Sequence, residues 1–332
     1  MDYKKILEDL ENKIYHPIYF LSGEEPYYID LISDYIAENV LTEAEKGFNQ
    51  TVFYGKDTEI QTIIESSRRF PMMANQQVII VKEAQSLKKI EDLKTYVENP
   101  LKSTILVINY KYKKLDKRTG FAKALQKNGI LYESARFYEN KIPGWIEQYL
   151  AESKYSIAPQ AAIMLSEYLG ANLSKVANEL KKLIIALPEK TKITPEHIEK
   201  NIGISKDYNV FELQNALGER NVLKANQIIN YFGSNPASNP IQRTTSSLYM
   251  YFSKLFMYHF LKDKSENSVA GSLGLHPFIA KSYISAAKRY KPHKLFDIVG
   301  ILREYDMKSK GFGNVSVSGG DLQKEMIYKI LH

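Results

Sequence analysis

The chain has 332 residues, more than one hydrophobic core usually supports, so we expect two or three domains. It contains no cysteine, which excludes disulfides, thiolate nucleophiles and cysteine–zinc sites, and its formal net charge of +7 permits a polyanionic partner without requiring one. No apolar run of about 18 residues and no signal-peptide pattern occurs, so we expect no membrane span and a cytoplasmic location.

The first 141 residues alternate between strand and helix patterns. Short apolar runs typical of strands occur at 18–21, 51–54, 78–81, 104–108 and 130–132. Between the first two, Ile29, Ile32 and Ile36 recur at helical spacing. Strands separated by helices predict a parallel, doubly wound sheet, and the β-branched run at 78–81 is typical of a strand buried on both faces.

The turn after the first strand, at Ser22-Gly23-Glu24-Glu25, is where such a fold would hold a nucleotide phosphate. A phosphate-binding P-loop needs a second glycine, a lysine and a following hydroxyl, and all three are missing here. Two carboxylates would repel phosphate, and Pro26 lacks an N–H donor. The turn therefore predicts a degenerate site with no nucleotide cofactor and no intrinsic catalysis.

Bulky residues stand at 70–73, between a helical pattern and the strand at 78–81, where a short polar loop would be usual. Pro71 cannot continue a helix and biases Phe70 toward an extended conformation. Met72 and Met73 have flexible, polarizable side chains that suit a groove on another protein. Two interpretations stay open: these side chains pack inward beneath the helix ends, or they point outward at a partner.

Residues 111–127 are strongly basic and include Lys113, Lys114, Lys117 and Arg118. Such a run is most often a solvated loop, but it could contact an acidic neighbour or a DNA backbone.

From residue 142 onward the patterns are helical only. We expect a small helical domain at 142–207 and a larger one at 208–332. In the latter, the pattern at 241–262 is apolar nearly all round, which predicts a helix buried on several sides, by its own domain or by neighbouring subunits. Lys288 and Arg289 lie close to Tyr283 and Tyr290, so phosphate contact with aromatic stacking is a further hypothesis.

The six histidines are scattered, and none stands at the spacing of a metal or hydrolase site. We therefore expect no metal and no catalytic residues.

Several segments resemble one family. The residues Phe-Pro-Met-Met-Ala-Asn-Gln-Gln-Val-Ile-Ile-Val at 70–81 resemble the segment of bacterial DNA polymerase III delta subunits that carries the sliding-clamp-binding element. The turn at 22–30 is similar to that family's degenerate loop, and 170–183 to its Gly-x-Asp-Leu motif, with Asn172 in place of the usual aspartate. The segment at 205–213 is similar to the family's link into its third domain, and Asp306 and Lys310 match a pattern at the end of a helix.

The resemblance implies an AAA+-like α/β domain at 1–141, a helical lid at 142–207 and an all-helical oligomerisation collar at 208–332. It implies a clamp-loader subunit that binds and opens the sliding clamp (beta subunit) for loading onto primed DNA, without ATPase activity of its own. Phe70, Pro71, Met72 and Met73 would contact the clamp. The gamma/tau and delta prime subunits would be the other partners, and the chain would share in DNA polymerase activity only as a member of the holoenzyme.

Two alternatives come from other functional classes. An active AAA+ ATPase of DNA metabolism is opposed by the lysine missing after Gly23. A general DNA-binding protein would bind DNA on its own with a steep salt dependence.

Overall fold

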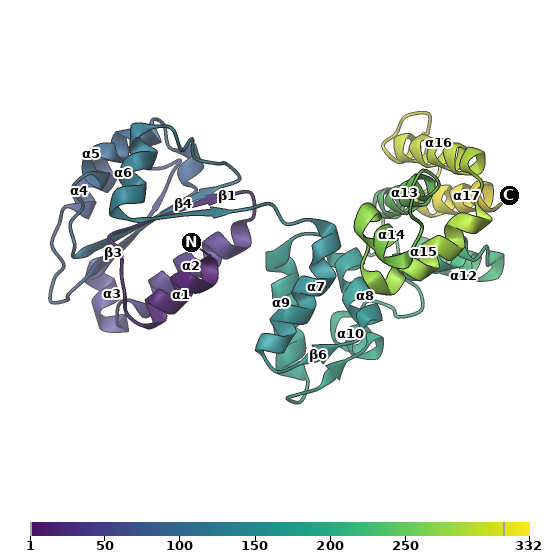
Figure 1. Ribbon diagram of the computed structural model, residues 1–332, viewed down its shortest axis with the longest axis horizontal. Coiled ribbons are helices and arrows are strands. Elements are labelled where there is room, and N and C mark those ends of the chain that lie inside the picture. The colour runs from purple at the N-terminus through teal and green to yellow at the C-terminus, as the bar shows by residue number, and fades with distance from the viewer. Residues whose placement is uncertain (1, 315) are drawn as a thin grey trace. The chain divides into compact units, whose positions relative to one another are not determined.

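The computed structural model describes residues 2–314 and 316–332. The chain divides into two compact units, Met1–Phe137 and Tyr138–His332 (Figure 1). The first unit ends a few residues before the boundary at 141 that the sequence patterns indicate. Each unit is described by itself.

The first unit is built on a five-stranded sheet in the order β2-β3-β4-β1-β5. The strands are β1 (Ile18–Gly23), β2 (Gln50–Tyr54), β3 (Gln77–Lys82), β4 (Thr104–Lys111) and β5 (Ile130–Ser134). All neighbours pair in parallel, so the predicted parallel sheet is confirmed. Successive residues of β3 enter opposite cores: Val78 and Ile80 pack on one face, and Ile79 and Val81 on the other.

Helices cover both faces of this sheet, as parallel connections require (Figure 1). The helices α1 (Tyr3–Glu11), α2 (Pro26–Asn39) and α3 (Glu43–Asn49) lie below the sheet in Figure 1, and α4 (Ile60–Ser67), α5 (Lys94–Val97) and α6 (Gly120–Asn128) lie above it. Two short 3-10 turns, at Ala84–Ser86 and Ile90–Leu93, join β3 to α5. This arrangement is the predicted doubly wound α/β fold.

Two helices of this unit differ from the sequence patterns. The short α3 carries too few apolar residues to give a periodic signal, and a capping box between Thr42 and Glu45 supports its start. The second half of the basic run forms α6, because the Thr119 hydroxyl accepts a hydrogen bond from the Ala122 N–H and caps the helix. Only the first half of the basic run is a loop.

The second unit is helical apart from a two-residue strand pair, β6 (Ser156–Ile157) with β7 (Lys192–Ile193). A 3-10 turn at Glu139–Lys141 leads into α7 (Ile142–Glu152), α8 (Pro159–Leu169), α9 (Leu173–Ala186) and α10 (Pro195–Ile202). The later helices are α11 (Val210–Gly218), α12 (Val222–Ser234), α13 (Ile241–Tyr258), α14 (Glu266–Leu273), α15 (Pro277–Arg289), α16 (Pro292–Ser309) and α17 (Gly319–Leu331). None of the helices in the described ranges is both long and apolar enough to cross a membrane.

The earlier and later helices of this unit are in contact. Helix α8 packs against α11, and the Gln160 amide donates to the Glu212 carboxylate at 3.3 Å. The Ser247 hydroxyl of α13 likewise donates to the Glu167 carboxylate of α8 at 3.1 Å. Residues 138–332 therefore form one compact unit, and the finer division into a lid and a collar at 207 stays a prediction.

Helix α13 is buried by its own unit along one face, and the predicted burial of its other sides by neighbouring subunits stays a prediction. Its buried residues form one stripe: Ile241, Thr244, Thr245, Leu248, Tyr251, Phe252, Leu255 and Tyr258. Tyr249, Met250 and Met257 are exposed on the remaining surface, and Phe260 lies beyond the end of the helix. The aromatic residues of this helix are therefore divided between the buried stripe and the exposed surface.

Candidate functional site

The two regions singled out by the sequence lie at opposite ends of the sheet. The loop at 70–73 leads into β3 and so lies at the amino ends of the parallel strands. The turn at 22–25 follows β1 and lies at their carboxyl ends. The two regions can therefore act independently.

The loop at 70–73 presents its large side chains to solvent. The exposed fraction is 76% for Phe70, 61% for Met72 and 103% for Met73, whereas Pro71 is half-buried. Of the two interpretations left open, inward packing is therefore wrong. Met73 has φ of 52°, in the left-handed region that a methionine seldom occupies, so the surroundings must hold the loop in this shape.

The chain on either side of the loop is held by polar groups at the amino ends of β3 and β4. The Gln77 amide donates to the Thr104 hydroxyl at 2.7 Å and to the Arg69 carbonyl. The Thr104 hydroxyl in turn donates to the Ser67 carbonyl at 2.9 Å, and Tyr96 donates to the same carbonyl at 3.2 Å. These buried contacts fix the chain where α4 ends and where β3 begins.

The middle of the loop is held from α3. The Asn49 side chain accepts a hydrogen bond from the Met72 N–H at 2.6 Å and donates one to the Met72 carbonyl at 2.9 Å. The backbone of Met72 is thus fully paired while its side chain points outward.

The turn at 22–25 is closed by its own hydrogen bonds. The Gly23 N–H donates to the Lys113 carbonyl and the Glu24 N–H to the Ser134 carbonyl, each at 3.0 Å. The Tyr27 N–H donates to the Glu25 carboxylate at 2.9 Å, which caps α2. Three backbone donors of this turn, from Gly23, Glu24 and Tyr27, are therefore already in use and are not aimed at a phosphate.

The acidic side chains around this turn are partly neutralised by burial and by nearby lysines. Glu25 is buried, and this burial raises the pKa of its carboxyl, partly offset by its hydrogen bond from the Tyr27 N–H. Glu24 lies 3.7 Å from the Lys114 ammonium, which also lies 3.4 Å from Glu133. Lys117 pairs with Glu133 at 2.6 Å, and this contact lowers the pKa of the Glu133 carboxyl. Lys114 and Lys117 therefore neutralise the acidic edge of the turn.

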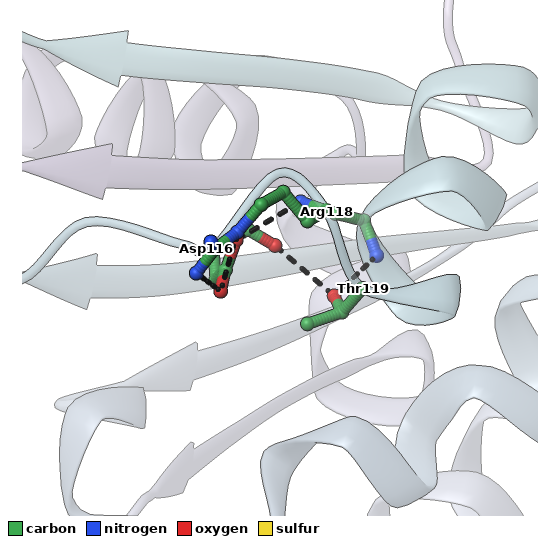
Figure 2. Close-up of polar contacts among 4 residues, drawn as sticks. Asp116, Arg118 and Thr119 are labelled. Carbon is green, nitrogen blue, oxygen red and sulfur yellow. Dashed lines mark hydrogen bonds and ion pairs between the residues drawn. The ribbon is translucent and has the colours of Figure 1, made fainter.

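The other two cations predicted in this loop, Lys113 and Arg118, are also engaged by residues of the first unit. Figure 2 shows the Arg118 guanidinium against Asp116, with contacts of 2.9 Å from Nε to Oδ1 and 2.8 Å from Nη2 to Oδ2. The hydrogen bonds from Arg118 lower the pKa of the Asp116 carboxyl to about 2. Lys113 donates to the Gln85 carbonyl at 3.3 Å. Most of the positive charges singled out in the loop at 111–118 are therefore paired with groups of the first unit.

The predicted stacking site on α15 does not form. Lys288 and Arg289 are exposed, and the Arg289 guanidinium donates to the Gly218 carbonyl at 3.2 Å. Tyr283 and Tyr290, however, are buried in the helical core, and Tyr290 donates to the Leu217 carbonyl at 2.7 Å. The two cations remain available for phosphate, but no base could stack on these rings.

Within residues 2–314 and 316–332, no three histidine, aspartate or glutamate side chains are grouped so that they could hold a metal ion.

Sequence patterns missed the residues that shape the exposed loop. Asn49 belongs to no motif, and Gln77 stands in the segment at 70–81 that resembles the family, but nothing in the sequence indicates the contacts that either side chain makes. Their pairing with Met72 and with the end of α4 is created by strands that are adjacent in space but not in sequence.

Comparisons with known proteins address the family directly. The family model described as "DNA polymerase III, delta subunit" matches residues 19–134, and the model of the delta subunit's C-terminal domain matches 207–315. DNA polymerase III subunit delta of Bacillus subtilis is 25% identical over 307 residues, which cover 89% of this chain and 88% of the relative. The probable delta subunit of Aquifex aeolicus is 24% identical over 311 residues, covering 88% and 86%.

A solved structure shares the fold. The Bacillus subtilis DNA clamp loader delta protein superimposes with a TM-score of 0.61 at 21% identity, over 99% of both chains. The two family models lie at either end of the chain and describe the same protein, and the two relatives extend the similarity across most of what lies between. This chain belongs to the DNA polymerase III delta subunit family.

Proposed function

We propose that this chain binds the sliding clamp through Phe70, Pro71, Met72 and Met73, opens it for loading onto primed DNA, and hydrolyses no ATP itself. The observation that carries the proposal is the loop at 70–73, whose apolar side chains are exposed while its backbone is held by buried polar contacts. An exposed apolar group on a rigid base is suited to a pocket on a partner, because little order is lost on binding. The direct test is calorimetric titration of the full chain with the sliding clamp of its own organism.

Nucleotide binding provides a separate test. We expect no measurable ATP affinity with or without Mg²⁺, because the turn at 22–27 uses its N–H donors internally and carries Glu24 and Glu25 in place of a lysine. Calorimetry and a phosphate-release assay on the purified chain check this. Saturable binding of ATP at micromolar concentration would contradict it and would favour the alternative of an active AAA+ ATPase.

The proposed partners within the clamp loader are the gamma/tau and delta prime subunits, with residues 208–332 as the oligomerisation collar.

A general DNA-binding role has less support, because Lys113, Lys114, Lys117 and Arg118 are engaged within their own unit. DNA contact by these residues or by Lys288 and Arg289 is proposed only within the assembled loader. The proposed role places the chain with the replication machinery of the cytoplasm.

A fragment containing residues 1–137 separates clamp binding from assembly. We expect it to bind the clamp within about threefold of the full chain, because this unit has its own two-layered core and holds the whole loop. It should fail to enter the complex with the other subunits in size-exclusion chromatography. A fragment that assembles normally would show that the collar assignment is wrong. A cut at 206 is less suitable, because it would break the contacts between α8 and the later helices.

A further inference from the structure

We propose that Asn49 is the positioning residue of the clamp-binding loop, and that Phe48 beside it forms a further apolar contact with the clamp. The inference rests on the proposed clamp-binding function and extends that surface to a second segment of the chain. It concerns α3, which no sequence motif indicated.

The sheet topology brings the two segments together. Strands β2 and β3 pair in parallel, with Gln50 opposite Val78. The residues that enter these strands therefore meet at the same end of the sheet: α3 ends at Asn49 immediately before β2, and the loop at 70–73 runs into β3. Helix α3 is thus placed at the edge of the exposed loop.

Asn49 is shaped for the contact with Met72. Its side chain is 4% exposed, and it pairs with the Met72 N–H at 2.6 Å and the Met72 carbonyl at 2.9 Å, as a neighbouring strand would. The same amide nitrogen donates to the Glu45 carbonyl of α3 at 3.2 Å. Only a side chain with both a donor and an acceptor can make this pair, because aspartate would set an oxygen against the Met72 carbonyl.

This pairing has a consequence for binding. Met73 follows directly and occupies the left-handed region at φ 52°, so without the pairing the loop would relax to more common conformations. Ordering a loop residue on binding opposes association, whereas a loop that is already ordered avoids this loss. Asn49 therefore keeps the side chains of Met72 and Met73 presented before the clamp arrives.

Phe48 is the exposed residue that precedes Asn49 in α3. It is 75% exposed on the last turn of α3, next in sequence to Asn49 and so only about 3.8 Å away between Cα atoms. The start of α3 is fixed by the Thr42 N–H, which donates to the Glu45 carboxylate at 2.9 Å. We infer that the exposed Phe48 ring extends the apolar surface of the loop, so that a clamp bound to Met72 and Met73 would cover it as well.

The test measures clamp affinity of the full chain with three single variants. Asn49→Ala should weaken binding about tenfold to thirtyfold, and Phe48→Ala about tenfold, which is about 1.4 kcal/mol. The matched control is Tyr112→Ala, because Tyr112 is 65% exposed at the other end of the sheet and should leave affinity unchanged. Hydrogen exchange of the Met72 and Met73 amides should accelerate in Asn49→Ala and not in Phe48→Ala.

Asn49→Ala removes a buried polar side chain, so its melting temperature and active fraction are measured together with affinity. A variant that melts earlier but binds the clamp with unchanged affinity per folded molecule would make Asn49 a purely structural residue and overturn the inference. Equal clamp affinities for Phe48→Ala and Tyr112→Ala would show that Phe48 is not part of the clamp-binding surface. If the unaltered chain does not bind the clamp at all, the proposed function itself fails, which is a distinct result.

Discussion

Replacing both Met72 and Met73 with alanine should lower the affinity for the sliding clamp by about two to four decades. Burying one such side chain is worth roughly 1.5–3 kcal/mol, so the pair supplies about 3–6 kcal/mol before ordering losses. At about 1.4 kcal/mol per decade, that loss nearly abolishes binding. Titration calorimetry of the double variant against the clamp measures the effect.

The same double variant should keep its thermal stability. Met72 is 61% exposed and Met73 103% exposed, so truncating them removes little buried surface. Tyr112→Ala again serves as the control for loss of an exposed side chain elsewhere in the unit. A double variant that melts well below the parent but binds the clamp tightly would return these methionines to the core and contradict the proposed function.

Replacing Gly23 with alanine should destabilise the first unit by about 3 kcal/mol or more. A Cβ at this position would lie 2.0 Å from the Ser134 carbonyl oxygen, a backbone atom of β5 that no side-chain rotation can move. Gly23 also has φ of 126°, a conformation that L-amino acids rarely adopt. The variant must therefore separate β1 from β5 or twist the turn open.

The matched control is Gly47→Ala in α3, because no heavy atom lies within 4 Å of the added Cβ. That change should be neutral or stabilising by up to about 1 kcal/mol, since alanine favours the helix. Urea titration of the 1–137 fragment by circular dichroism measures both variants. Fluorescence is unsuitable, because the one tryptophan, Trp145, lies outside this unit. A Gly23→Ala fragment as stable as the parent would mean that the turn is loosely packed and would weaken the case for a closed nucleotide site.

The sequence was sufficient for those features that depend on local pattern. Continuous apolar runs such as 78–81 indicated strands buried on both faces. A strand with one face in solvent would instead alternate apolar and polar side chains. The regular change from apolar runs to helical spacing indicated parallel connections, and the missing lysine after Gly23 indicated a degenerate phosphate site. The local pattern singled out Met72 and Met73 but left open whether they face inward or outward, and the resemblance to a family favoured contact with a partner.

The remaining features depend on contacts between segments far apart in sequence. Whether Met72 and Met73 face inward or outward is decided by the core beneath them, which Ile79, Ile80 and their neighbours already fill. Lys114 and Lys117 pair with Glu133 because β5 lies beside β1 in the sheet. No local sequence pattern shows this strand pairing. The burial of Tyr283 and Tyr290 likewise depends on how the helices of the second unit pack.

Two features of the candidate site show most clearly the difference between what local sequence determines and what tertiary structure decides. Local sequence determined that no phosphate-binding motif follows β1, because that motif is a set of residue types at fixed spacing. Tertiary structure alone decided that the Gly23 and Glu24 amides are paired with Lys113 and Ser134, and that Asn49 holds Met72. Hydrogen bonds of this kind join residues that meet only when parallel strands align, so their partners are set by the register of the sheet and not by the neighbouring residues in the chain.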